Sequence, residues 1–361
     1  GHGTHVAGTI LAAQQADGFS GVAPQAELYV GKVCDLEGCS NIAVALGIDW
    51  GATQQTRVLN LSLGGDDTSR AEKMAIQKAE RLGIIIVAAS GNDGKPKVGF
   101  PAAYPTSIAV GAIDSDGKKA DFSQWGNELD VMAPGVEILS SVPMGTAKVS
   151  KVFAVNMGDK AGDKASADLE IPSRAFFDSA AVDKEIQLPI ADFGLGVISG
   201  QNLQGQIALI DRGQNSFEDK VKNAVRSGAK AVLIVNDEPG LFEGSVSSDE
   251  NSTKLSPVPV FMIEKTSGQM LRQSLQKGQS VQVRLQSFVS DYDLYSGTSM
   301  ATPHVAGLVA LLLSAKPDLS PGQARDILSK SCEPIPGENT HRVGNGLLQA
   351  DKALGKVLEI R

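Results

Sequence analysis

Short, almost wholly apolar runs alternate with helical segments between residues 28 and 134, and this alternation restricts the fold more than any other feature of the sequence. An uninterrupted apolar run is typical of a parallel strand that is buried on both faces. The alternation therefore predicts an α/β fold with a mostly parallel central sheet and right-handed crossovers. The predicted strands are 28–33, 58–63, 84–90 and 107–113.

Capping residues mark where helices begin and end. A helix is predicted from about Asn41 to Thr53, with Ser40 as its cap, and a second begins at Ser69 with Glu72 as a capping-box partner. Towards the C-terminus, segment 297–315 is apolar nearly all round, which predicts a buried helix.

A different pattern occupies residues 145–286, which are richer in polar side chains and have their own strand and helix signals. A helix with one apolar stripe is predicted after Ser216, and strands are predicted at 207–212, 231–237, 257–263 and 281–286. Because the first pattern resumes at Tyr292, we interpret 145–286 as a domain inserted into a first domain. That first domain comprises 1–144 and 287–361.

Charge and hydropathy exclude some classes of partner. The net charge is −8, from 33 Lys+Arg and 41 Asp+Glu, and the basic residues form no long run. The sequence therefore predicts no nucleic-acid partner. The longest strongly apolar stretch, around 305–313, is too short to span a bilayer, so no membrane span is expected.

Three cysteines stand at positions 34, 39 and 332. Cys34 and Cys39 flank a short loop, and they are either a local disulfide or two ordinary thiols. A disulfide would favour an oxidising compartment. Cys332 is the unpaired one of the three.

Three separated segments carry the residues of acyl-transfer chemistry: GHGTHVAG (1–8), AASGND (88–93) and GTSMATPHVAG (297–307). They contribute His2, Asn92 and Ser299. A serine hydroxyl becomes a nucleophile when an imidazole can accept its proton. A serine at a helix N-terminus also brings a free N–H group to the oxyanion, and a side-chain amide completes the oxyanion hole.

In this order and spacing, the three segments resemble those of the subtilisin-like serine proteases (subtilases). The resemblance covers about 1–144 and 287–361 and implies a three-layer subtilisin-like fold. It also implies a serine endopeptidase that acts through an acyl-enzyme. His2 would be the general base, Ser299 the nucleophile and Asn92 the oxyanion side chain.

The same resemblance implies a substrate-binding region. One segment would pair with an extended peptide, and two further segments would line a roomy primary pocket that accepts large apolar side chains. The residues concerned are Ser62, Leu63, Gly64, Ala89, Ser90, Gly91 and Gly99.

Residues 145–286 resemble protease-associated (PA) domains, which several subtilases carry at this position. The insert has no nucleophile, base or metal cluster of its own.

Subtilases also use an aspartate that orients the histidine, and in the family it lies on a strand upstream of that histidine. Asp49 and Asp93 do not stand in the family's motif for this role. The resemblance therefore implies that the N-terminal part of the catalytic fold, with the aspartate, lies outside this sequence. The alternative interpretation is a catalytically incomplete fragment or a non-catalytic protein-binding pseudoprotease.

Loop 12–21 has the length and position of a family calcium loop, in which Gln15 would supply a side-chain oxygen. No cofactor is expected for the chemistry, and structural Ca²⁺ is the expected ion. The resemblance further implies a secreted, extracellular, monomeric enzyme that acts on proteins or peptides.

An α/β-hydrolase is disfavoured for two reasons. In that fold the nucleophilic serine precedes the histidine and lies in a G-x-S-x-G motif. Here His2 precedes Ser299, and Ala301 replaces the second glycine.

Overall fold

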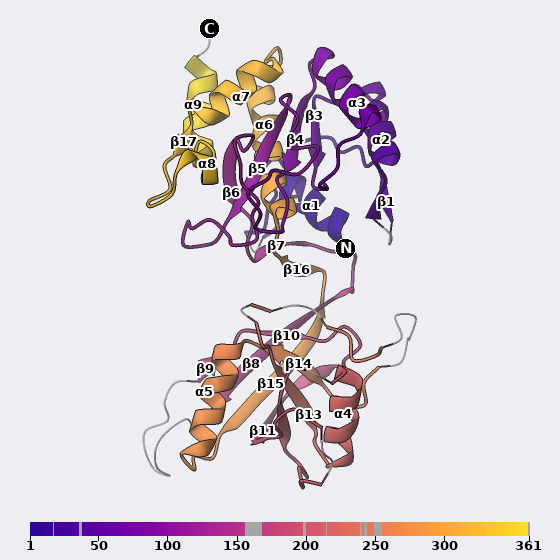
Figure 1. Ribbon diagram of the computed structural model, residues 1–361, viewed down its shortest axis with the longest axis vertical. Coiled ribbons are helices and arrows are strands. Elements are labelled where there is room, and N and C mark those ends of the chain that lie inside the picture. The colour runs from indigo at the N-terminus through magenta and orange to yellow at the C-terminus, as the bar shows by residue number, and fades with distance from the viewer. Residues whose placement is uncertain are drawn as a thin grey trace. The chain divides into compact units, whose positions relative to one another are not determined.

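The computed structural model describes residues 1–16, 18–35, 38–155, 168–197, 200–213, 215–238, 240–241, 244–248 and 255–359. The chain divides into two compact units (Figure 1). The first unit combines Gly1–Pro143 with Tyr292–Arg361, and the second is Met144–Asp291.

A six-stranded sheet in the order β17-β18-β6-β5-β4-β3 forms the centre of the first unit. Neighbours from β18 to β3 are parallel, and only β17 is antiparallel to its neighbour. The predicted α/β fold with a mostly parallel sheet is therefore confirmed. The strands are β3 (Val58–Leu61), β4 (Ile85–Ala89), β5 (Ser107–Ile113), β6 (Val131–Pro134), β17 (Cys332–Glu333) and β18 (Leu347–Leu348).

Helices cover both faces of this sheet, which gives three layers. Alternate residues of a strand face opposite sides, so Ile86 packs with α2 and α3, while Ile85 and Val87 pack with α6, α7 and α9. Figure 1 shows α2 and α3 on one side and α9 on the other. The helices are α1 (His2–Leu11), α2 (Asn41–Thr53), α3 (Arg70–Arg81), α6 (Thr298–Ala315), α7 (Pro321–Ser329), α8 (Thr340–Val343) and α9 (Ala350–Glu359).

Two short antiparallel ribbons complete the first unit. One joins β1 (Cys34–Asp35) to β2 (Gly38–Cys39), and Cys34 and Cys39 form a disulfide across it. The other, which we call the β7–β16 ribbon, joins β7 (Ile138–Ser141) to β16 (Tyr292–Tyr295).

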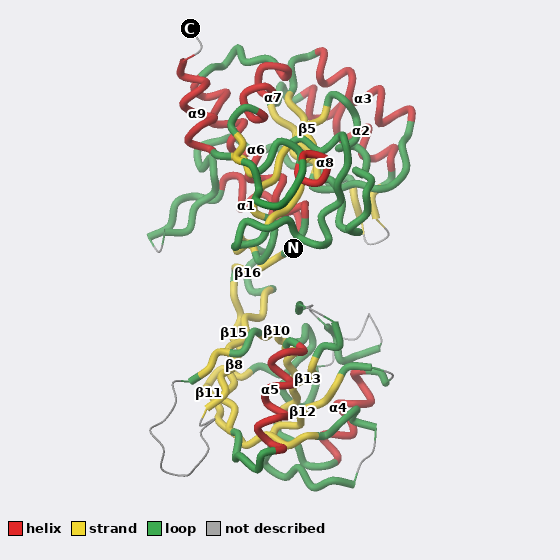
Figure 2. The backbone as a smooth tube through the Cα atoms, turned by 60° about the vertical axis from the view of Figure 1, so that its left-hand side comes forward, coloured by secondary structure: helices red, strands yellow, loops and turns green. Residues whose placement is uncertain are grey.

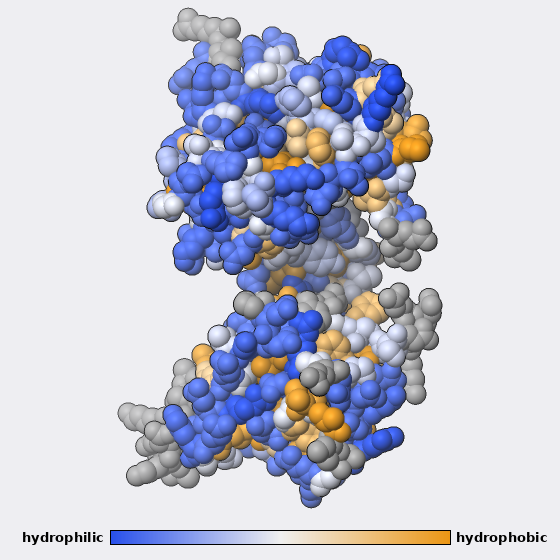
Figure 3. Space-filling view, in the orientation of Figure 1, coloured by the Kyte–Doolittle hydropathy of each residue, from blue (hydrophilic) through white to orange (hydrophobic). Residues whose placement is uncertain are grey.

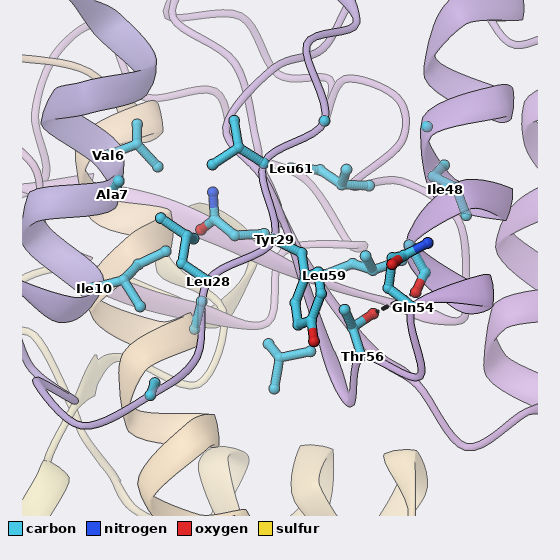
Figure 4. A pocket seen from close by; sticks show the side chains of 18 of the residues that line it. Val6, Ala7, Ile10, Leu28, Tyr29, Ile48, Gln54, Thr56, Leu59 and Leu61 are labelled. Atoms are coloured by element: carbon cyan, nitrogen blue, oxygen red, sulfur yellow. Dashed lines mark hydrogen bonds between the residues drawn. The ribbon is translucent and has the colours of Figure 1, made fainter.

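The strand predicted at 28–33 does not form. Leu28, Tyr29 and Val30 are 45%, 47% and 71% exposed, and β3 is only partly buried at the edge of the sheet. A cavity of about 620 Å³ lies between this segment, β3, α1 and α6. Figure 4 shows Leu28 and Tyr29 lining it with Val6 and Leu61. Segment 28–33 pairs with no strand in this structure, and β3 on the other side of the cavity is the last strand of its sheet.

Helix α6 is the one described helix that is long and apolar enough, by length and composition, to cross a membrane, and 67% of it is buried inside the protein. Its packing against the sheet and α9 accounts for its composition. On the face shown in Figure 3 the surface is mainly hydrophilic, and apolar side chains gather only in small groups.

The second unit is built on an eight-stranded sheet in the order β10-β14-β13-β12-β11-β15-β8-β9. Its strands are β8 (Ala147–Val155), β9 (Leu169–Glu170), β10 (Ser173–Ala175), β11 (Val182–Asp192), β12 (Ile207–Asp211), β13 (Ala231–Val235), β14 (Val260–Ile263) and β15 (Gln282–Ser290).

Two helices cover opposite faces of this second sheet, α4 (Phe217–Arg226) and α5 (Lys265–Gln276). Val221 of α4 packs with Ala208 and Ile210 of β12, whereas Leu271 of α5 packs with Ile207 and Leu209. Figure 2 shows both helices against the strands.

Candidate active site

Ser299 is the second residue of α6, so its backbone N–H lies in the first turn, where helices leave donors unpaired. Its hydroxyl donates to the carbonyl oxygen of Ser62 at 3.1 Å, and the Ser62 hydroxyl donates back to the Ser299 carbonyl at 2.7 Å. This reciprocal pair ties the beginning of α6 to the residue that follows β3.

Small residues allow α6 to begin close to the sheet. The N–H of Gly297 donates to the carbonyl of Gly135 at 2.8 Å. A Cβ on Gly135 would lie 2.9 Å from the Gly297 carbonyl oxygen and 2.6 Å from the Ala112 Cβ. Larger side chains here would push the Ser299 end of α6 outward.

Asn92 is held in one orientation by the same helix start. Its Oδ1 accepts from the Thr298 N–H at 2.8 Å and from the Thr298 hydroxyl at 2.9 Å. A Cβ on Gly297 would lie 3.5 Å from the Asn92 Nδ2. With Oδ1 committed to two donors, the amide N–H groups of this exposed residue remain available for an anionic oxygen beside Ser299.

His2 is the first residue of α1, and partial desolvation lowers the pKa of its imidazole. Helix α1 packs against α6. His5 lies close enough to His304 to affect its pKa, and the Ile10 carbonyl lies 3.5 Å from where a Gly307 Cβ would be. The two helices therefore run in the same direction at this contact, and their first residues lie at the same end of the pair.

Two further histidines lie deeper in this region. The Nε2 of His5 donates to the carbonyl oxygens of Ile138 and Asp293 at 2.9 and 3.1 Å, and His304 bonds the Met300 carbonyl at 2.9 Å. Burial is the main cause that lowers the pKa of each imidazole. Both side chains are therefore neutral near pH 7, and both are structural parts of the helix pair.

We expect acid to destabilise the first unit through His5 and His304. In the unfolded chain both titrate near the ordinary value of 6.5, whereas their folded pKa values are lower. Below about pH 6.5 the unfolded state therefore binds more protons, so the free energy of unfolding decreases as the pH falls, by at most about 1.4 kcal/mol per pH unit for each group.

Urea melts at several pH values measure this slope. The His304→Gln variant should show a shallower pH dependence than the parent chain. An unchanged slope would show that His304 does not contribute.

The three predicted substrate segments meet at the carboxyl ends of β3 and β4. The N–H of Gly99 donates to the Ser90 carbonyl at 2.8 Å, and Gly65 and Phe100 exchange backbone hydrogen bonds at 2.9 and 2.8 Å. A Cβ on Gly64 would lie 2.8 Å from the Phe100 carbonyl and 3.8 Å from that of Ala89. Leu63 packs partly buried against the α2–α3 core, and Gly91 donates to the Thr298 hydroxyl at 3.2 Å.

Gln124 supports this region and is not identifiable as a site residue from the sequence. Its Oε1 accepts from the Asp93 N–H at 3.2 Å, its Nε2 donates to the Lys97 carbonyl at 2.6 Å, and its own carbonyl accepts from the Ser90 hydroxyl. Gly91 has a φ of +113°, and a Cβ there would lie 2.2 Å from the Gln124 Oε1. A lone glutamine in a loop gives no sequence signal for such a role.

The loop predicted to bind calcium is a tight turn. Gln15 bonds the Phe19 carbonyl through its N–H at 2.8 Å, and its side-chain Nε2 donates to the Ala13 carbonyl at 3.2 Å. Gly18 has a φ of +92°. Asp17 lies outside the described residues. Within the described part of the chain, no group of three or more His, Cys, Asp or Glu side chains is placed to hold a metal.

Cys332 is partly buried in the first unit and is a free cysteine. Burial, and secondarily the nearby Asp130 carboxylate, raises the pKa of its thiol to about 12. The thiolate that reactive cysteines need is therefore disfavoured at neutral pH, so Cys332 is an inert thiol.

A comparison with known protein families found one family that matches the first unit and one that matches the second. The subtilase family matches residues 1–160 and 273–349, and the PA domain family matches residues 154–271. Subtilisin E of Bacillus subtilis (strain 168) is 49% identical over 150 residues, which are 40% of this chain and 39% of that protein. Subtilisin Savinase of Lederbergia lenta is 44% identical over 147 residues, covering 40% of this chain and 55% of that protein.

The chain therefore aligns with 39% and 55% of the lengths of these two relatives. Among solved structures, a psychrophilic subtilisin-like protease, Apa1, from the Antarctic Pseudoalteromonas sp. AS-11 superposes with a TM-score of 0.63 at 25% identity. That superposition covers 98% of this chain and 83% of the other.

Proposed function

Because the chain belongs to the subtilase family and carries a PA domain, we propose that it is a serine endopeptidase that cleaves protein substrates through an acyl-enzyme intermediate. The observation that carries this proposal is the joint placement of Ser299 and Asn92. Thr298 orients the amide through two hydrogen bonds, and the next residue in the chain is the proposed nucleophile.

In the proposed mechanism, the Ser299 oxygen bonds to the scissile carbonyl carbon while His2 takes the hydroxyl proton. The oxyanion accepts hydrogen bonds from the Ser299 N–H and the Asn92 amide. The intermediate collapses, the C–N bond breaks, and His2 gives its proton to the leaving amine. Water then attacks the acyl-enzyme with His2 as base, which releases the carboxylate product and restores the Ser299 hydroxyl.

We assign the aspartate that orients His2 to a strand outside this sequence. The cavity of about 620 Å³ beside the β3 edge supports this assignment, because its lining is largely apolar and the 28–33 segment across it makes no strand pairing in the structure. A strand there would satisfy the open edge of β3 and cover Leu28 and Tyr29.

A covalent probe tests the proposal against the rival pseudoprotease. A fluorescent organophosphonate should label the full-length protein that contains this chain, and its Ser299→Ala variant should remain unlabelled. The same protein should hydrolyse a casein substrate. Absence of both labelling and hydrolysis in the folded full-length protein would favour the non-catalytic alternative.

We also propose a primary specificity pocket that is open to large apolar side chains. Gly99 supports this, because a Cβ there would lie 3.2 Å from the Gly65 carbonyl and 3.3 Å from the Ser90 carbonyl, so the glycine keeps that space clear. The Gly99→Val variant is expected to lose most of its kcat/KM for a phenylalanine-containing peptide, by about tenfold to a hundredfold, and to keep activity on an alanine peptide. Equal losses on both peptides would contradict a pocket role.

A structural calcium ion in loop 12–21 is part of the same proposal, with the Gln15 Oε1 and loop carbonyls as ligands. The loop fits this chemistry because its donors are oxygens and the Gln15–Ala13 hydrogen bond uses Nε2, which leaves Oε1 for the ion. Calcium at about a hundred times its Kd should stabilise the protein by about 2.7 kcal/mol. Thermal melts with calcium, with EGTA and in Gln15→Ala measure this, and an equal response of the variant would exclude Gln15.

We assign residues 1–144 and 287–361 to the catalytic domain and 145–286 to the PA domain. Strand β15 pairs with β8 as far as Ser290, which favours an insert that ends a few residues later than this assignment.

The Cys34–Cys39 disulfide favours export to an oxidising, extracellular compartment, and we propose a secreted monomer. Cell fractionation and gel filtration test these two points, and a reduced cytoplasmic protein would contradict export.

A further inference from the structure

His5 connects α1 to both strands of the β7–β16 ribbon. Its Nε2 lies 2.9 Å from the Ile138 carbonyl of β7 and 3.1 Å from the Asp293 carbonyl of β16. Both partners are acceptors, so Nε2 must carry the proton, and one N–H group is shared between the two strands. The side chain is fully buried, and its Nδ1 has no hydrogen-bond partner among the described residues.

The His5 ring also stacks on Tyr295. The two ring centroids are 4.4 Å apart and the planes are inclined by 6°. The Tyr295 hydroxyl in turn lies against the start of the chain, since a Cβ on Gly1 would be 2.8 Å from it. His5 is one helical turn after His2, and Tyr295 lies four residues before Ser299.

This arrangement makes a short path between the proposed base and the proposed nucleophile. From His2 it follows α1 to His5, crosses to Tyr295 and the two ribbon carbonyls, and continues along the chain to Ser299. A separate bond between the same helix and ribbon lies beside this path, in which the Ser140 hydroxyl donates to the His5 backbone carbonyl at 2.7 Å without contacting the His5 ring. The His5 ring touches both ribbon strands and the Tyr295 ring at once.

We propose that His5 is a positioning residue that fixes the start of α1, and with it the His2 imidazole, relative to Ser299. The expected effect on catalysis rests on the proposed function. The structural part, that His5 fixes the position of the His2 imidazole, does not depend on that function. A proton transfer between two side chains is sensitive to their separation, and a misplacement of about 1 Å can cost on the order of a hundredfold in rate. His5 itself needs no contact with substrate.

A pair of amide substitutions at this position separates positioning from general stability. In His5→Gln the amide nitrogen replaces Nε2 and can still donate to the ribbon carbonyls. In His5→Asn the shorter side chain cannot reach them. Ser140→Ala is the matched control, because it removes a buried bond between the same helix and ribbon without altering the His5 ring.

The measurements are kcat and KM on a peptide substrate and the NMR titration of isotope-labelled His2, all made on the folded full-length protein well below its melting temperature. We expect His5→Asn to lower kcat by about tenfold to a hundredfold with KM within about twofold of the parent. We also expect it to displace the His2 titration. His5→Gln should recover most of the kcat and the parent titration, and Ser140→Ala should leave both unchanged while lowering the melting temperature.

A folded His5→Asn protein with the parent kcat and the parent His2 titration would overturn the proposal. If His5→Asn does not fold, Tyr295→Leu provides the second variant, because it removes the stacked ring from a half-exposed position and leaves the Nε2 bonds. A displaced His2 titration in that variant would support the proposal, and an unchanged one would refute it. The NMR readout is independent of turnover, so an inactive parent would refute the protease function without deciding the role of His5.

Discussion

Replacing Ser299 by alanine is expected to abolish peptide-bond hydrolysis while the protein remains folded. The substitution removes the only atom that can form the acyl-enzyme in the proposed mechanism. In subtilisin itself, a relative of this chain, loss of the nucleophile costs on the order of a millionfold in kcat, and that magnitude is taken from the relative rather than derived from this geometry. The lost Ser299–Ser62 hydrogen bond should cost only about 1 kcal/mol of stability.

The Ser62→Ala variant is the control for Ser299→Ala. It removes the reciprocal hydrogen bond, in which the Ser62 hydroxyl donates to the Ser299 carbonyl at 2.7 Å, and keeps the nucleophile. Its kcat should stay within about tenfold of the parent. Turnover by a purified Ser299→Ala protein at more than a thousandth of the parent rate would show that another group is the nucleophile.

Replacing Asn92 by leucine is expected to lower kcat strongly and KM little. Leucine has a similar shape but no amide to donate to the oxyanion, which exists only in the transition state and intermediate. The expected loss of about a hundredfold to a thousandfold again comes from the corresponding substitution in subtilisin. Steady-state kinetics on one peptide substrate separate the two constants.

Thr298→Val is the matched control for Asn92→Leu. It removes one of the two hydrogen bonds that orient the Asn92 amide and retains the bond from the Thr298 N–H at 2.8 Å. A smaller loss than in Asn92→Leu is therefore expected. If Asn92→Leu keeps the parent kcat, the amide does not stabilise the oxyanion.

Strong local signals predicted most elements of the fold. The apolar runs at 84–90 and 107–113 became β4 and β5, whose residues are all buried, because such runs can avoid water only inside a sheet covered on both faces. At Ser320 both hydrogen bonds of the capping box form with Gln323. At Ser69 only half of it forms, because the Glu72 side chain is buried and interacts with Tyr104.

The segment 28–33 does not form the predicted strand, and the sequence of the segment itself does not show why. Its apolar residues are typical of strands, but a strand forms only where a neighbouring strand supplies hydrogen bonds. In this structure Val30 is 71% exposed and the adjacent β3 edge opens onto a cavity. Pairing depends on long-range partners, so it cannot be inferred from the composition of the segment alone.

The sequence by itself predicted His2, Asn92 and Ser299 as the site residues, because the chemistry of acyl transfer demands particular side chains and these three stand in the motifs that carry them. The folded chain alone decided how they are held: the two bonds from Thr298 to Asn92, the Gln124 support behind Gly91, and the His5 bonds to two strands. These contacts join residues far apart in the chain. Their formation depends on how the sheet and helices pack, which local sequence patterns do not encode.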